Sequence, residues 1–216
     1  MTRPERLDHP TRQAQILETA ARVFTEKGYE KASMLDIARA TGLTKAGVYH
    51  HIDSKEELLS AIISYGMDLF EHKVLDRTIA MRDPLERLRA TLRGHLLLVL
   101  RDRPREVTVI LHESGALPPQ ARSRINVRKK RYIRFLESTI RELVMRKIAR
   151  RVDPTIAAFA LLGMVNWTYQ WYRPGGRLSE EDLAEAMTDF YLRGLLQPDR
   201  EGSGGRPAAP RRVGTA

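Results

Sequence analysis

The segment SMLDIARATGLTKAGVYHHIDSKEELL, residues 33–59, decides the fold of this chain. Ser33 is a favourable N-cap, and Asp36 places an acidic side chain in the first turn of the helix that follows. Gly42 falls where that helix must end, because glycine adopts the left-handed conformation without a Cβ penalty. Thr44 can cap another helix directly afterwards. The segment therefore predicts a short helix, a tight turn and a second short helix.

The second short helix presents a surface that suits the major groove of DNA. From Thr44 to His51 the chain mixes hydroxyls, cations and one aromatic ring with small residues. Hydroxyls and cations hold phosphates, small residues allow close approach, and side chains at a helix N-terminus can reach base edges. A small helical subdomain with a polar face is the alternative, since turns that contain glycine are common between helices. Ser54 and Glu57 then match a capping box for a further helix.

The same segment, together with ILETAARVFTEKG at residues 16–28, resembles the N-terminal DNA-binding domain of the TetR family of bacterial regulators. Three positions depart from the family pattern, Thr41, Leu43 and Ile52, and each keeps its polar or apolar character. The residues that match the pattern are Phe24, Gly28, Tyr29, Ser33, Ile37, Ala38, Ala40, Gly42, Thr44, Gly47, Tyr49, Lys55 and Leu58.

The resemblance implies a set of DNA contacts in and around the second short helix. We expect Thr44 and Tyr49 to hold phosphates and Lys45 to reach a guanine edge. Lys55, at the next helix start, is expected to hold phosphate as in the family, and Ser33 to do the same from the helix before. The residues expected to bind DNA are Ser33, Thr44, Lys45, Ala46, Tyr49, His50 and Lys55.

Composition agrees with a polyanionic partner. The 216 residues include 37 Lys and Arg against 27 Asp and Glu, which gives a formal net charge of +10. A basic balance of this size favours double-stranded DNA, with an anionic membrane surface as the alternative. No apolar run approaches the ~18 residues of a membrane span, and no signal peptide opens the chain, so we expect a cytoplasmic protein. The absence of cysteine excludes disulfides and thiolate metal sites, and we expect no metal and no cofactor.

The chain is predicted to be all-α, with an N-terminal three-helix helix-turn-helix domain and a C-terminal helical domain for ligand binding and dimerisation. Hydrophobic periodicity and breaks at proline and glycine delimit the parts. We expect a flexible basic arm at 1–10, the DNA-binding domain at 11–55, the effector-binding and dimerisation domain at 56–197 and a disordered tail at 198–216. Within the second domain, helices are expected from 54 through Phe70 and at 85–100, 106–113, 120–151, 154–172 and 179–196.

The expected helix at 120–151 carries a dense set of cations with few acidic side chains among them. One interpretation is a solvated face, because most charge runs are only that. The other is that some of these cations, Arg131 among them, surround the site of an anionic effector, since arginine pairs well with phosphates.

The last two helices are more apolar than one subunit can cover, which favours an isologous four-helix dimer interface. This agrees with the homodimer that the TetR resemblance implies. The second short helix of each protomer, here called the reading helix, would then lie roughly 34–36 Å from its partner's copy, or somewhat more on widened DNA. The residues expected at the interface are Phe159, Leu162, Tyr169, Leu183, Met187, Phe190 and Tyr191.

Two tryptophans four residues apart, Trp167 and Trp171, share a face of the helix at 154–172. They are either core and interface aromatics or, with Asn166, the wall of a ligand cavity. The segment from Gly163 to Ser179 resembles a TetR subgroup that senses acyl-CoA and related CoA thioesters, which implies such an effector here. His95 and His112 are either hydrogen-bonded buried residues or pocket groups. The residues expected to bind the ligand are therefore Trp167, Trp171, Asn166, His95, His112 and Arg131.

Three classes of function follow from these observations. The first is a ligand-responsive repressor that binds a palindromic operator and is released when an effector moves the fourth helix. The effector is a CoA thioester or, as an alternative, a hydrophobic drug-like compound, as in regulators of efflux. The second is an enzyme that acts on CoA thioesters, but the sequence has no Gly-rich phosphate loop, nucleophile elbow or metal pair, and we expect no catalytic residues. The third is a sequence-independent binder, which would show steep salt dependence and equal affinity for scrambled DNA.

Overall fold

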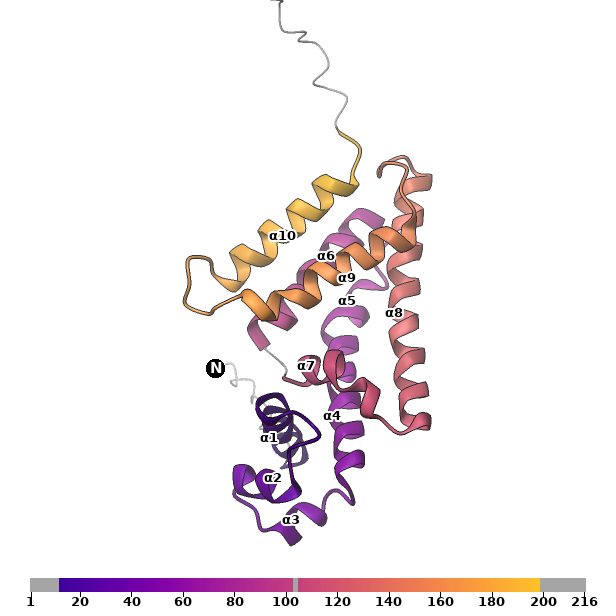
Figure 1. Ribbon diagram of the computed structural model, residues 1–216. Helices are drawn as coiled ribbons and strands as arrows, with labels where there is room; N and C mark the ends of the chain where they lie inside the picture. Colours follow the sequence, from indigo (N-terminus) through magenta and orange to yellow (C-terminus); the bar gives the residue numbers. More distant parts are fainter. Residues whose placement is uncertain (1–11, 103–104, 199–216) are drawn as a thin grey trace, which may run out of the picture.

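The computed structural model describes residues 12–102 and 105–198, and within these ranges the chain is all-α, as predicted. The expected arm at 1–10 and the expected tail beyond Pro198 lie outside the described residues. Figure 1 shows the first three helices at one end of the molecule and the last two toward the other, with long helices between them.

Three helices and the start of a fourth form one end of the described chain, here called the head. Ser33 caps the second helix: its side chain accepts from the Asp36 amide, while the Asp36 carboxylate accepts from the Ser33 amide. Gly42 ends that helix with a φ of 69°, in the left-handed region. Ser54 accepts from the Glu57 amide to start the fourth. The helices of the head are α1 (Arg12–Lys27), α2 (Met34–Thr41), α3 (Lys45–Tyr49) and α4 (Lys55–Phe70).

The helix that begins with α4 continues into the second part of the chain through a π-helical stretch. Such insertions of one wide turn are frequent at functional sites. A second one follows α6, where the Leu-rich run ends. The remaining elements are η1 (Glu71–Leu75), α5 (Asp76–Thr78), α6 (Pro84–Leu97), η2 (Leu98–Asp102), α7 (Arg105–His112), η3 (Ser114–Ala116), α8 (Pro119–Met145), α9 (Pro154–Trp171) and α10 (Glu180–Leu195).

The helix expected at 120–151 ends earlier, at Met145. Lys147 then adopts a left-handed φ of 58°, and the chain turns to meet the end of α10. There the Arg150 amide donates to the Leu195 carbonyl and Gln197 donates to Ile148, each at 3.0 Å. These long-range backbone bonds compete with a continued helix, which is why helical periodicity alone overestimated the length of α8.

The buried side chains form two clusters, and α7 contributes to the cluster of the head. Val109 and Ile110 of α7 are buried with Phe24 of α1 and Ile62 of α4. Accordingly, α7 packs against both α1 and α4. The second cluster joins α6, α8, α9 and α10. The head is therefore packed directly onto a helix of the second part and is not joined to it through α4 alone.

Candidate DNA-binding surface and ligand pocket

One buried side chain orients the reading helix α3. Val48 has no exposed surface, whereas Lys45, Ala46, Tyr49 and His50 are exposed. Because Val48 fixes the inward face of this single turn and a half, the four residues predicted to bind DNA share the solvent side. The placement supports their predicted role.

Thr44 caps α3 and still has its own hydroxyl proton to donate. Its side-chain oxygen accepts from the Gly47 amide at 3.0 Å, so its own O–H remains free to donate to a phosphate. A Cβ at Gly47 would lie 3.2 Å from that oxygen, which explains the small residue at this place. Next to the cap, the Lys45 ammonium lies 5.8 Å from the centroid of the Tyr49 ring.

Ser33 and Lys55, the two outer residues of the predicted DNA-binding set, also have structural roles in the head. The Ser33 hydroxyl donates to the Asp36 carboxylate at 2.8 Å. A hydrogen bond from Lys27, followed by those from Ser33, holds the pKa of Asp36 below its usual range. The Lys55 ammonium donates to the Glu30 carbonyl at 3.1 Å and lies 4.3 Å from the centroid of the Tyr29 ring. Both side chains therefore anchor the surface that α3 presents.

A cavity with a volume of about 180 Å³ lies among α4, α6, α7, α8 and α9. We call it the central pocket. Its walls are mostly apolar, and its polar side chains are few, which is typical of small-molecule sites. It contains two of the residues predicted to bind ligand, His95 and Asn166. The lining residues are Gly66, Met67, Phe70, His95, Ile110, Leu111, Lys129, Tyr132, Ile133, Leu162 and Asn166.

His95 and Tyr132, which both line the central pocket, form a hydrogen-bonded aromatic group. The His95 Nδ1 lies 3.2 Å from the Tyr132 hydroxyl, and the Phe70 ring packs edge-on against both. Burial lowers the pKa of His95 to about 4 and raises the pKa of Tyr132 above its usual range. Both groups are therefore neutral at pH 7 and can offer hydrogen bonds without charge.

Lys129 is the cation of the central pocket, and sequence reasoning missed it. Its ammonium donates to the Ile110 carbonyl at 3.2 Å and to the Ser114 hydroxyl at 2.9 Å. Burial lowers its pKa. In the sequence it is one of many cations on α8, and only its hydrogen bonds at the end of α7 distinguish it. Arg131, the residue predicted from that run, is exposed and lines neither this cavity nor the next.

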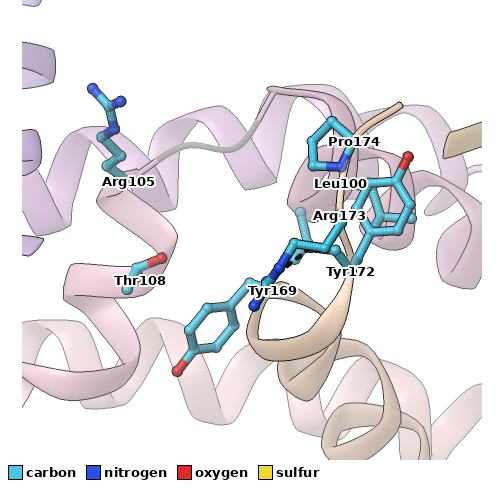
Figure 2. A pocket seen from close by; sticks show the side chains of 8 residues that line it. Leu100, Arg105, Thr108, Tyr169, Tyr172, Arg173 and Pro174 are labelled. Atoms are coloured by element: carbon cyan, nitrogen blue, oxygen red, sulfur yellow. Dashed lines mark hydrogen bonds between the residues drawn. The ribbon is translucent and has the colours of Figure 1, made fainter. Parts of the chain in front are cut away.

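A second cavity, with a volume of about 270 Å³, opens beside the end of α9. Figure 2 shows Arg105 and Thr108 of α7 on one side and Tyr169 and Arg173 on the other. His112, predicted as a pocket group, bonds through Nε2 to the Tyr169 hydroxyl and lines neither cavity. The lining residues are Val99, Leu100, Arg105, Thr108, Tyr169, Tyr172, Arg173 and Pro174.

The two tryptophans predicted to wall the ligand cavity lie outside both cavities. Trp167 is 62% exposed and shares an outward face of α9 with Phe159 and Trp171. On α10, Phe190 is 75% exposed, with exposed small residues one turn away on either side. We call these outward surfaces the free face. It consists of Ile156, Phe159, Ala160, Gly163, Trp167 and Trp171 on α9 and Ala186, Phe190 and Gly194 on α10.

Of the residues predicted at the dimer interface, Phe159 and Phe190 lie on the free face. Leu183 is buried within the protomer, and Met187 packs partly buried on the same core. Periodicity could not separate these positions, because α9 is apolar nearly all round and no face stands out. The other three predicted residues also make contacts within the protomer: Leu162 lines the central pocket, Tyr169 lines the second cavity and the Tyr191 hydroxyl donates to the Ala157 carbonyl at 2.8 Å.

Metal centres and membrane-spanning helices are both absent from the described residues. Among them, no group of three or more His, Cys, Asp or Glu side chains is placed to hold a metal ion. None of the described helices is long and apolar enough to cross a bilayer.

Family profiles match both parts of the chain. Residues 16–62 match the profile described as bacterial regulatory proteins, tetR family. Residues 81–195 match the one described as tetracyclin repressor-like, C-terminal domain. The two matches cover most of α1, all of α2 and α3, the first half of α4 and the helices from α6 to α10.

Solved structures and curated relatives give the same assignment. The crystal structure of AibR in complex with isovaleryl coenzyme A and operator DNA matches with a TM-score of 0.78 and 49% sequence identity, over 83% of this chain and 97% of that one. PfmR from Thermus thermophilus, a TetR family transcriptional regulator, matches with a TM-score of 0.75 and 36% identity, over 84% and 99%. The HTH-type transcriptional repressor KstR2 of Mycobacterium tuberculosis is 25% identical over 189 residues, which cover 87% of this chain and 94% of KstR2.

Proposed function

Since this chain belongs to the TetR family of bacterial regulators, we propose that it is a transcriptional repressor that binds a palindromic operator as a homodimer and is released by a short-chain acyl-CoA. The observation that carries the proposal is the 49% identity to AibR over 97% of a chain solved with isovaleryl coenzyme A and operator DNA. A repressor acts where the DNA is, so we place the protein in the cytoplasm. Binding, not turnover, is its proposed activity.

The central pocket is the proposed site for the acyl group of the effector. Its volume of about 180 Å³ lies below the roughly 300–1,000 Å³ of pockets that enclose drug-sized ligands, which favours a short acyl chain. The apolar walls suit the hydrocarbon, and His95 and Asn166 supply uncharged polar groups.

The head supplies the proposed operator contacts. Thr44 and Tyr49 are placed to hold phosphates and Lys45 to reach a base edge, with Ala46 and His50 on the same exposed side. Two heads are needed to read a palindrome, and the free face supplies the contact between protomers. A twofold pairing of these faces would bury the exposed aromatics of α9 and α10.

Operator binding and effector release test the proposal together. A duplex is selected from a random pool with the full-length protein, and its affinity is measured by fluorescence anisotropy with and without isovaleryl-CoA. We expect the selected site to be palindromic and the affinity to fall at least about fivefold with isovaleryl-CoA but not with free CoA. Equal affinity for a scrambled duplex would refute the sequence-specific repressor, and release by a neutral hydrophobic dye alone would refute the effector class.

A further inference from the structure

Lys129 stands between the central pocket and the C-terminal end of α7. Its ammonium donates to the carbonyl of Ile110, in the last turn of α7, and to the hydroxyl of Ser114, just beyond it. A cation at the last carbonyls of a helix is favourable, because these groups lack partners within the helix and carry the negative end of the dipole. Lys129 therefore links this helix end to α8.

The charge of Lys129 is unbalanced in the part of the chain that the structure describes. Its two acceptors are neutral oxygens, and no carboxylate there forms an ion pair with it. By contrast Arg128, its neighbour on α8, pairs with both Asp68 and Glu71. A half-buried ammonium has three N–H groups, of which two are used here. The third remains available to an acceptor in the central pocket, which Lys129 lines.

The end of α7 is also bonded to the head. Glu113, which follows α7, accepts from the backbone amide of Tyr29 at 3.4 Å. Ile110 lines the central pocket and at the same time belongs to the buried cluster of the head. A displacement of this helix end therefore acts on the segment that joins α1 to α2, and through it on the orientation of α3.

From this arrangement we propose that Lys129 is the effector-contacting residue that transmits occupancy of the central pocket to the head: it donates a hydrogen bond to the carbonyl oxygen of a bound acyl thioester and carries the shift through α7 to Tyr29. This rests on the proposed function, because it deepens the same site. The displacement is transmitted through Ile110, Ser114 and Glu113, in addition to the movement of α4.

The chemistry of the pocket identifies the group that Lys129 binds. His95 is held neutral by burial, with Tyr132 as its partner, so Lys129 is the charged donor among the residues that line the pocket. A hydrogen bond from a charged group is about twice as strong as a neutral one, and an ammonium is suited to a polarised oxygen. The thioester carbonyl is the oxygen nearest to an acyl chain that occupies the apolar walls.

The test measures the coupling between effector and operator in variants of the full-length protein. The ratio of operator Kd at saturating isovaleryl-CoA to operator Kd without it is determined for wild type, Lys129→Met and Ser114→Ala. Lys130→Met is the matched control, because Lys130 is the next cation on α8, is exposed and lines neither cavity. Circular dichroism and thermal unfolding establish that each variant is folded.

We expect a wild-type ratio of at least about five, a ratio below about two for Lys129→Met, and an intermediate ratio for Ser114→Ala, which keeps the pocket side of the contact. Lys130→Met should match the wild-type ratio. Because loss of stability alone would not change this ratio, the measurement distinguishes transmission of the effector signal by Lys129 from a purely structural role. If Lys129→Met does not fold, a ratio of operator Kd values in Ser114→Ala equal to that of the wild type refutes transmission through α7.

A Lys129→Met protein that releases DNA as the wild type does at saturating isovaleryl-CoA would overturn the inference and leave the proposed function standing. A wild type that binds its operator but ignores isovaleryl-CoA would instead overturn the effector assignment, and this inference with it.

Discussion

Replacing Phe190 by glutamate should separate the proposed dimer into monomers. The Phe190 side chain is 75% exposed at the centre of the α10 part of the free face, between the small residues Ala186 and Gly194. An aromatic side chain of this kind buries about 150–250 Å² in an interface. At about 25 cal/mol per Å², the lower figure corresponds to about 4 kcal/mol per copy as an upper estimate.

A twofold interface contains each residue twice, so the single change acts at two places. Allowing for incomplete burial, the loss is about 5–8 kcal/mol per dimer, which raises the dimer Kd at least about a thousandfold. Burial of two carboxylates would add to this cost.

Sedimentation velocity at micromolar concentration measures the effect. The wild type should sediment as two chains of 24.7 kDa and Phe190→Glu as one, with weaker operator binding because paired heads are lost. Val127→Glu is the control, since Val127 is 60% exposed on α8, outside the free face. If Phe190→Glu dimerises as tightly as the wild type, the free face is not the interface and the reasoning from exposure fails.

Three further predictions, which use four substitutions, test the head and the pocket. Tyr49→Ala should weaken binding to all duplexes, whereas Lys45→Ala should also relax base preference, as competition titrations would show; full operator affinity in both would mean that the reading face is misassigned. Gly47→Ala should weaken operator binding because its Cβ displaces the Thr44 cap, yet leave the free energy of unfolding within about 1 kcal/mol, since higher helix propensity offsets the lost cap; equal operator affinity would contradict this. The pKa of His95 is about 4 in the folded chain against an ordinary value of 6.5, so the unfolded chain binds more protons between these values and stability falls as pH drops. Urea unfolding should show a loss of about 2 kcal/mol from pH 7 to pH 5 that His95→Gln lacks, and an equal pH slope in both proteins would refute it.

The head could be predicted closely because its signals are local. The cap at Ser33, the left-handed Gly42 and the cap at Thr44 all depend on residues within one or two turns, and each has the predicted geometry. The exposed side of α3 follows from the same short-range pattern once Val48 points inward.

The pocket could be predicted only in part because its residues come together through packing. His95 and Asn166 were predicted and line the central pocket, but nothing local separates Lys129 from the other cations of α8. Trp167 was predicted to line the pocket but lies outside it. Its position on a helix that is apolar nearly all round allowed both a cavity wall and an interface. It was predicted to bind ligand, but the exposure of its ring favours the interface.

The most direct test of the account is a titration of isovaleryl-CoA into the complex of the full-length protein with its selected operator, followed by anisotropy of the labelled duplex. The account predicts that the duplex is released at saturation, with free CoA inactive at the same concentration. A complex that stays intact at saturating isovaleryl-CoA, while the protein remains dimeric and bound to its palindrome, would contradict it.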